Sequence, residues 1–276
     1  MIELAHYWYF TIFVLGTVIG SFLNVVIYRL HTGRSVNGRS HCMSCGETLQ
    51  WYELFPVVSY LVLHARCRTC GAYIPLRYLT VELLTGLTFL LLFTLFAPNY
   101  IAFLFHAVLL SVLIVISVYD LRHTIIPDEL TTAVGGLAFV SLVLEYVLMD
   151  HALGVFYNLV SGISAGGFLF FLWYVSKGKW IGLGDAKLAL PLGIIAGTSG
   201  ALSMIVLSFW IGAALSVSLL LLGMLLKKGK TVLPFACAGL TMKSEVPFAP
   251  FLILGFLLAH LFHVDIFVIT SHLIPL

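Results

Sequence analysis

Residues 100–119 read YIAFLFHAVLLSVLIVISVY and contain no Asp, Glu, Lys or Arg. A helix of this length spans the hydrocarbon core of a bilayer, which is about 30 Å thick, because each helical residue adds about 1.5 Å. The rest of the chain has the same character, since 61% of its 276 residues are hydrophobic and only 9% are charged. A soluble domain carries about 25% charged residues and could not bury so much apolar surface. The sequence therefore predicts an all-α polytopic membrane protein and excludes a soluble enzyme, a disordered chain and a secreted disulfide scaffold.

Seven further apolar runs have lengths that suit membrane-spanning helices. The run 186–200 is the weakest of them, because it is short and contains Pro191 and several glycines. Together with 100–119, the sequence predicts about eight spans, with seven as the main alternative. The other expected spans are 7–28, 78–96, 129–149, 152–175, 186–200, 201–226 and 247–264.

The basic residues predict how these spans are oriented, since short loops rich in Lys and Arg stay in the cytoplasm. With eight spans, all 14 Lys and Arg residues lie in or directly beside the four connections on one face, with Lys187 at the edge of the span 186–200, whereas the opposite face holds Glu3, Asp150 and Asp265. Both termini are therefore expected outside, with segments 29–77 and 227–246 in the cytoplasm. The net charge of only +2 gives no indication of a nucleic-acid partner.

Four cysteines between the first two expected spans form two C-x-x-C pairs, Cys42 with Cys45 and Cys67 with Cys70. A glycine follows each pair and permits the positive-φ turn that a metal-binding knuckle often needs. Four thiolates can close a tetrahedral Zn²⁺ site, and disulfides are not expected in the reducing cytoplasm. We therefore predict a structural zinc site, with iron or redox chemistry and free thiols as the alternatives.

Three aspartates lie at the expected cytoplasmic ends of spans, where ionisable groups are costly and usually functional. Asp120 directly follows 100–119, and a carboxylate at a helix C-terminus opposes the helix dipole. Asp128 has a structural explanation, because a carboxylate after proline favours the start of a helix. Asp185 ends the sequence GLGD at 182–185, in which two glycines let another part of the backbone approach. Two carboxylates from separate spans suit general acid–base hydrolysis, in which one keeps a proton while the other activates water.

These features together resemble the bacterial type IV prepilin peptidases, which combine a leader peptidase with an N-methyltransferase. The resemblance covers about residues 10–260 and includes six elements in the same order. They are GSFLNVVIYR at 20–29, the two C-x-x-C-Gly elements with WY at 51–52 between them, RY at 77–78 leading to ELLTG at 82–86, the stretch from Asp120 to Asp128, GLGD at 182–185, and PFAPFL at 247–252.

The resemblance implies an aspartic intramembrane protease of the Gly-x-Gly-Asp type, with Asp120 and Asp185 as the catalytic pair. It implies that the substrates are prepilins or pseudopilins, whose short basic leader is cut after a glycine at the cytoplasmic edge of the inner membrane. It further implies that S-adenosylmethionine is the donor for methylation of the new N-terminus. Glu82, at the start of an expected span, is the residue that we consider first for methyl transfer, with a helix-terminal carboxylate as its alternative role.

Residues around Asp185 are expected to support the substrate. Gly182 and Gly184 would keep the loop free of side chains where the substrate backbone passes. Lys187 would hold substrate or influence Asp185, or serve only as a positive-inside anchor.

The predicted organisation is a first transmembrane helix at 1–28, a cytoplasmic zinc-binding segment at 29–77, a membrane-embedded peptidase core at 78–264 and an outward-facing tail at 265–276. Residues 1–100 would form the region associated with methyl transfer.

Two other classes of function fit the same residues. An ion- or proton-coupled transporter with a zinc-stapled cytoplasmic loop would use Asp120 and Asp185 as a proton relay. A membrane scaffold whose zinc loop docks an ATPase would need the cysteines and neither aspartate. Changing each aspartate to asparagine separates the three classes.

Overall fold

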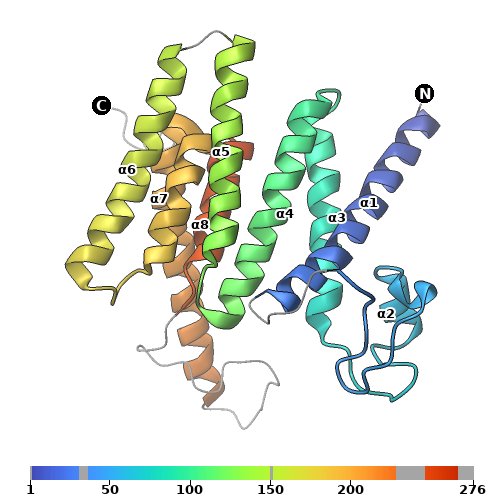
Figure 1. Ribbon diagram of the computed structural model, residues 1–276. Helices are drawn as coiled ribbons and strands as arrows, with labels where there is room; N and C mark the ends of the chain where they lie inside the picture. Colours follow the sequence, from blue (N-terminus) through green and yellow to red (C-terminus); the bar gives the residue numbers. More distant parts are fainter. Residues whose placement is uncertain (1, 31–36, 150–151, 228–245, 267–276) are drawn as a thin grey trace. The chain divides into compact units, whose positions relative to one another are not determined.

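The computed structural model describes residues 2–30, 37–149, 152–227 and 246–266. Within these ranges the membrane-length elements are all helices, and the segment around the cysteines consists of turns, two short helices and two isolated β-bridges, each of which joins the residues on either side of a C-x-x-C pair (Figure 1). The chain divides into two compact units, with the boundary between Val115 and Ile116 inside one helix. The helices are α1 (Ile2–Arg29), η1 (Trp51–Leu54), α2 (Val58–Val62), α3 (Leu76–Phe96), α4 (Tyr100–His123), α5 (Asp128–Met149), α6 (Ala152–Ser176), α7 (Leu183–Lys227) and α8 (Ala249–Leu261).

Six of these helices, α1, α3, α4, α5, α6 and α7, are long and apolar enough to cross a membrane. The prediction of an all-α polytopic protein is therefore confirmed, whereas the count of eight spans and the cytoplasmic location of segment 29–77 remain predictions. The expected spans 186–200 and 201–226 both belong to α7, which kinks at Gly197, where φ is 76° and ψ is −174°. The expected span 247–264 corresponds to α8, whose 13 residues reach only about 20 Å.

Several predictions concern residues outside the described part of the chain. They include residues 31–36 of the zinc-binding segment, Asp150, the connection 228–245 and the end of the tail at 267–276. The orientation inferred from these charges therefore stays a prediction.

In the first unit, α1 packs closely against α3 through glycines. A Cβ added to Gly20 would lie 2.8 Å from the Cα of Glu82, and one added to Gly86 would lie 2.7 Å from Cγ2 of Thr17. Small residues at such a crossing let two membrane helices approach, where dispersion contacts replace the hydrophobic effect. The side-chain amide of Asn24 adds a polar tie by donating to the carbonyl of Tyr78 at 3.1 Å.

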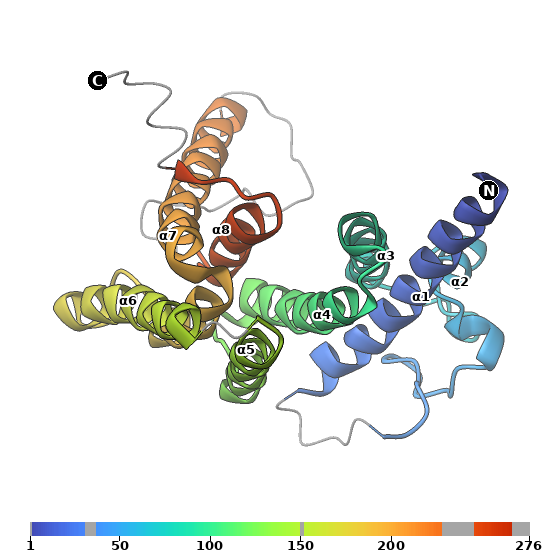
Figure 2. The same ribbon diagram turned by 90° about the horizontal axis from the view of Figure 1, so that it is seen from above.

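In the second unit, α7 packs against α5, α6 and α8, and Figure 2 shows it between α6 and α8. The contact with α6 again depends on glycine, because Gly162 and Gly166 face the backbone and side chains of α7. Proline or glycine stands at the connections, with Pro127 before α5 and Gly182 before α7. These connections bring the end of α4 and the beginnings of α5 and α7 to one site.

Replacing Gly162 by alanine is expected to destabilise the second unit. The added Cβ would lie 2.3 Å from Cγ1 of Ile194 and 2.6 Å from the carbonyl oxygen of Leu190. Overpacking of this kind costs about 1–3 kcal/mol, which thermal unfolding in detergent will report as a lower midpoint. Gly167→Ala is the matched control, since a Cβ there meets nothing within 4 Å. Equal midpoints for the two variants would contradict this packing.

Candidate active site and metal centre

A cavity of about 240 Å³ lies where the end of α4 meets the beginnings of α5 and α7. Asp120, in the last turn of α4, and Asp185, in the first turn of α7, both line it. The fold thus brings together two carboxylates that are 65 positions apart in the sequence. The other lining residues are Thr124, Ile125, Ile126, Asp128, Gly182, Leu183, Gly184 and Lys187.

The backbone of a distant helix holds the Asp120 side chain. Asp120 is only 4% exposed, and its Oδ2 accepts a hydrogen bond from the N–H of Ala249 at 3.1 Å. Ala249 is the first residue of α8, whose N-terminal end favours a negative charge. The negative charge of Asp120 is unfavourable at the C-terminus of its own helix, α4, and the N-terminal end of α8 therefore offsets this effect.

Asp185 is anchored by its own loop. It is 7% exposed, and its Oδ2 accepts a hydrogen bond from the N–H of Gly182 at 3.1 Å. Gly184 lies against the connection before α5, because a Cβ there would be 3.1 Å from Cβ of Ile126. Gly184 therefore permits the first turn of α7 to pack closely against the connection before α5, which is the kind of close approach that the two glycines predict.

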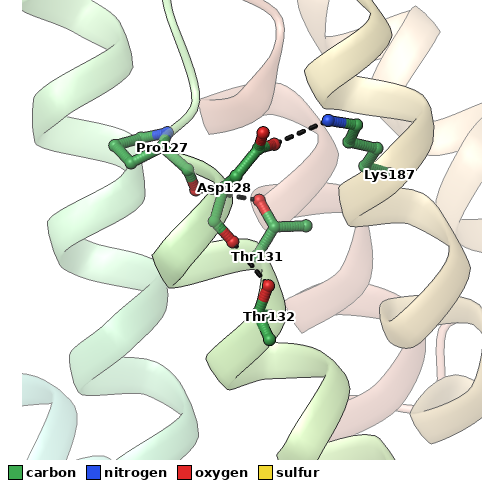
Figure 3. A network of polar contacts seen from close by, with 5 residues as sticks. All are labelled: Pro127, Asp128, Thr131, Thr132 and Lys187. Carbon is green, nitrogen blue, oxygen red and sulfur yellow. Dashed lines mark hydrogen bonds and ion pairs between the residues drawn. The ribbon is translucent and has the colours of Figure 1, made fainter.

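An ion pair joins the first turns of α5 and α7 at the same cavity (Figure 3). The ammonium group of Lys187 donates to Oδ1 of Asp128 at 2.7 Å. The expected helix start is confirmed, since α5 begins at Asp128. The hydroxyl of Thr131 donates to the carbonyl of Pro127 at 3.1 Å, and that of Thr132 donates to the carbonyl of Asp128 at 2.8 Å. The first turn of α5 is thus held in place while the Asp128 side chain points towards Lys187.

The four predicted metal ligands lie together in the first unit. Their four sulfur atoms all lie within 4.8 Å of one another, and they belong to Cys42, Cys45, Cys67 and Cys70. The sulfurs of Cys42 and Cys70 are 3.9 Å apart, close to the ~3.8 Å expected between ligands of a tetrahedral site with 2.3 Å Zn–S bonds. These residues therefore fit a zinc ion.

The two cysteine pairs form the same turn twice. In each turn the glycine N–H donates to the carbonyl of the first cysteine at 2.9 Å, from Gly46 to Cys42 and from Gly71 to Cys67. Both glycines have positive φ, 75° and 72°, as the sequence predicts. A backbone hydrogen bond from Cys45 lowers the pKa of the Cys42 thiol, whereas the neighbouring cysteines raise the pKa of Cys45, so that without a metal ion the negative charge of the cluster favours Cys42.

Glu82 connects three elements of the first unit. It is buried in the second turn of α3, and its Oε2 accepts a hydrogen bond from the N–H of Val57 at 2.8 Å. A second hydrogen bond links it to the hydroxyl of Ser21 on α1. The structure thus gives Glu82 a bracing role, and its part in methyl transfer remains a prediction.

Comparison with known protein families identifies two matches along the chain. Residues 14–96 match the bacterial peptidase A24 N-terminal domain, and residues 107–217 match the type IV leader peptidase family. No solved structure matches the chain.

Curated relatives agree with these matches. A prepilin leader peptidase/N-methyltransferase of Myxococcus xanthus is 37% identical over 76% of this chain, which spans 62% of that relative's length. The type 4 prepilin-like proteins leader peptide-processing enzyme of Escherichia coli is 34% identical over 80% of this chain and 86% of its own. A prepilin leader peptidase/N-methyltransferase of Vibrio cholerae is 31% identical over 67% of this chain and 76% of its own. The chain therefore belongs to the type IV prepilin leader peptidase family.

Proposed function

We propose that this protein removes the short basic leader of prepilins or pseudopilins by cutting after a glycine at the cytoplasmic face of the inner membrane, and then methylates the new N-terminus. The names of the relatives support both activities. The observation that carries the proposal is the presence of two buried aspartates on one cavity. Family membership does not favour the transporter alternative.

The proposed peptidase reaction uses one water molecule between Asp120 and Asp185. Backbone donors engage Oδ2 of each carboxylate, so that Oδ1 of each is the oxygen offered to water. One carboxylate takes a proton from the water as its oxygen attacks the glycine carbonyl, and the other donates a proton to the leaving amine. The products are a leader with a C-terminal carboxylate and a pilin with a free amino terminus. No covalent intermediate forms.

Two carboxylates held close together suit this exchange, because such a pair favours a state with one shared proton over full ionisation. Their titration belongs to the pair. The cavity of about 240 Å³ admits extended peptide backbone and water but no folded domain. Gly182 and Gly184 carry no side chains that would obstruct this passage.

We propose that the metal ion and the methyl donor both bind to the first unit. Cys42, Cys45, Cys67 and Cys70 hold Zn²⁺, which stabilises a segment too small to build its own core. S-adenosylmethionine supplies the methyl group when it is bound. Glu82 is our candidate for positioning the new amino terminus, since a buried carboxylate can accept a hydrogen bond from the neutral amine and take up the proton that methylation releases.

Purified protein in detergent, incubated with a prepilin, tests the proposal. Mass spectrometry is expected to show release of a leader that ends in glycine and, with S-adenosylmethionine present, a pilin heavier by one methyl group. An intact prepilin would contradict the peptidase proposal. A cleaved but unmethylated pilin would contradict the second activity alone.

Losing the ion pair between Asp128 and Lys187 is expected to slow cleavage. Lys187→Met removes the tie between α5 and α7 and should reduce kcat/KM by only about two- to fivefold, because both side chains are largely exposed and an exposed ion pair contributes less than about 1 kcal/mol. The charge exchange D128K/K187D restores an ion pair and should recover most of the loss. If the exchanged variant is no better than Lys187→Met, the pair does not act by holding the two helices.

A further inference from the structure

Exposed apolar side chains lie between the two cysteine pairs and supply none of the four metal ligands. Five of them are between 51% and 71% exposed, namely Trp51, Phe55, Val58, Leu61 and Val62. Residues 54–65 contain no Asp, Glu, Lys or Arg. The rings of Trp51 and Phe55 are in contact, and Val58, Leu61 and Val62 follow each other at helical spacing on α2; exposed apolar side chains gathered in one short segment are unfavourable in water and mark a place of contact. We call residues 51–62, which include η1 and α2, the apolar connector; its one charged side chain, Glu53, accepts a hydrogen bond from the N–H of Gln50 at the start of η1.

A hydrogen bond fixes the depth of the apolar connector. The N–H of Val57, directly before α2, donates to Glu82 at 2.8 Å. Glu82 lies six residues into α3, or about 9 Å along the helix axis. Because α3 is itself apolar and long enough to span the membrane, α2 begins level with the first turns of a membrane helix. Figure 1 shows α2 beside this end of α3.

Aromatic rings and arginines accompany the connector. The guanidinium of Arg68 lies 5.3 Å from the ring centre of Tyr52, and that of Arg66 lies 4.2 Å from the ring centre of Tyr73. Trp and Tyr gather where hydrocarbon meets headgroups, and arginine stems reach from there to anionic phosphates. The chemistry therefore matches that of a lipid surface.

We propose that the apolar connector is an interfacial membrane anchor, which inserts the side chains of η1 and α2 at the boundary between headgroups and acyl chains of an anionic bilayer. The neighbouring helix α3 also exposes apolar side chains, since Leu76, Leu84 and Leu87 are more than half exposed. The anchor holds the cysteine site at the membrane surface. The inference does not depend on the proposed peptidase or methyl transfer.

Fluorescence of Trp51 tests the anchor in the full-length, zinc-loaded protein. The other four tryptophans, Trp8, Trp173, Trp180 and Trp210, are replaced by phenylalanine, and the protein is placed in nanodiscs of phosphatidylcholine and phosphatidylglycerol. Because an interfacial segment lies about 5–10 Å deep, lipids brominated near the top of their acyl chains should quench roughly half of the emission. Acrylamide in the aqueous phase should quench little.

A second tryptophan position tests whether the quenching reflects the whole segment and not only the surroundings of Trp51. Trp51→Phe combined with Leu61→Trp moves the single tryptophan to α2, and the same quenching is expected there. Zinc content equal to that of the wild type shows that the segment is folded. Strong quenching by acrylamide without an effect of brominated lipid would overturn the proposal. So would shielding that appears only with two chains per nanodisc, since it would assign the surface to a second copy.

Discussion

Replacing Asp120 or Asp185 by asparagine is expected to lower the rate of prepilin cleavage by about 10³-fold or more, because general acid–base catalysis contributes up to about 10⁴-fold and neither amide can transfer the proton. Asparagine keeps the size of the side chain and an oxygen that accepts from Ala249 or Gly182. The loss should therefore appear in kcat and leave KM nearly unchanged. Single-turnover cleavage with excess enzyme measures it.

A matched control separates chemistry from folding. Glu145→Gln makes the same carboxylate-to-amide change in the second unit, about 26 Å along α5 from Asp128. Glu145 accepts a hydrogen bond from Asn158, which glutamine can still accept, so that cleavage should be unchanged. Both aspartate variants should also melt at the wild-type temperature. Full cleavage by either aspartate variant would remove that residue from the reaction.

The cysteine site gives the second large expected effect. Replacing Cys67, the buried member of the set, by serine should reduce bound zinc from about one ion per chain to nearly none, since structural sites need all four ligands. Metal analysis of the purified protein measures this. The segment 37–75 should then exchange its amide hydrogens faster, because the metal supplies its folding energy.

Cys237→Ser is the control for this prediction. Cys237 is the fifth cysteine of the chain and belongs to neither C-x-x-C pair. Its replacement should leave the zinc content unchanged. If Cys67→Ser retained zinc at the wild-type ratio, the four-cysteine site would be wrong.

The class of fold could be predicted from the sequence, because in a membrane length and hydropathy determine which segments become helices. The uncharged run 100–119 lies within α4, and the Pro-Asp dipeptide at 127–128 marks the start of α5. The glycines after each cysteine pair likewise predict the positive φ that both adopt. These features depend only on neighbouring residues.

The exact position of the break in α7 could not be predicted in the same way, since the expected boundary lies at 200–201 and the kink lies at Gly197. Hydropathy continues through residues 183–219, and the change of direction occurs at Gly197, one of several glycines there. The glycine at which the helix bends depends on how α7 packs against its neighbours. A Cβ on Gly197 would lie 3.3 Å from the side-chain oxygen of Asn158 on α6, and this contact comes from the fold.

The partners within the site were also missing from the sequence interpretation. The donor to Asp120 is the backbone N–H of Ala249, 129 residues away. Nearly every residue type has a backbone N–H, so the identity of residue 249 does not indicate this hydrogen bond. The proline at position 250 does indicate a helix start there. Lys187 was expected near Asp185, yet its partner is Asp128, because the two helix starts converge only in three dimensions.

In the proposed reaction, Asp120 and Asp185 act as one unit on one water molecule. The double variant D120N/D185N tests this joint action against the two single variants by single-turnover cleavage of a prepilin. When two groups act as one unit, removing either of them already abolishes their joint contribution to the rate, and removing the second costs little more. The double variant should therefore cleave no more than about threefold slower than either single variant. A double variant slower by the product of the two separate losses would contradict the shared mechanism.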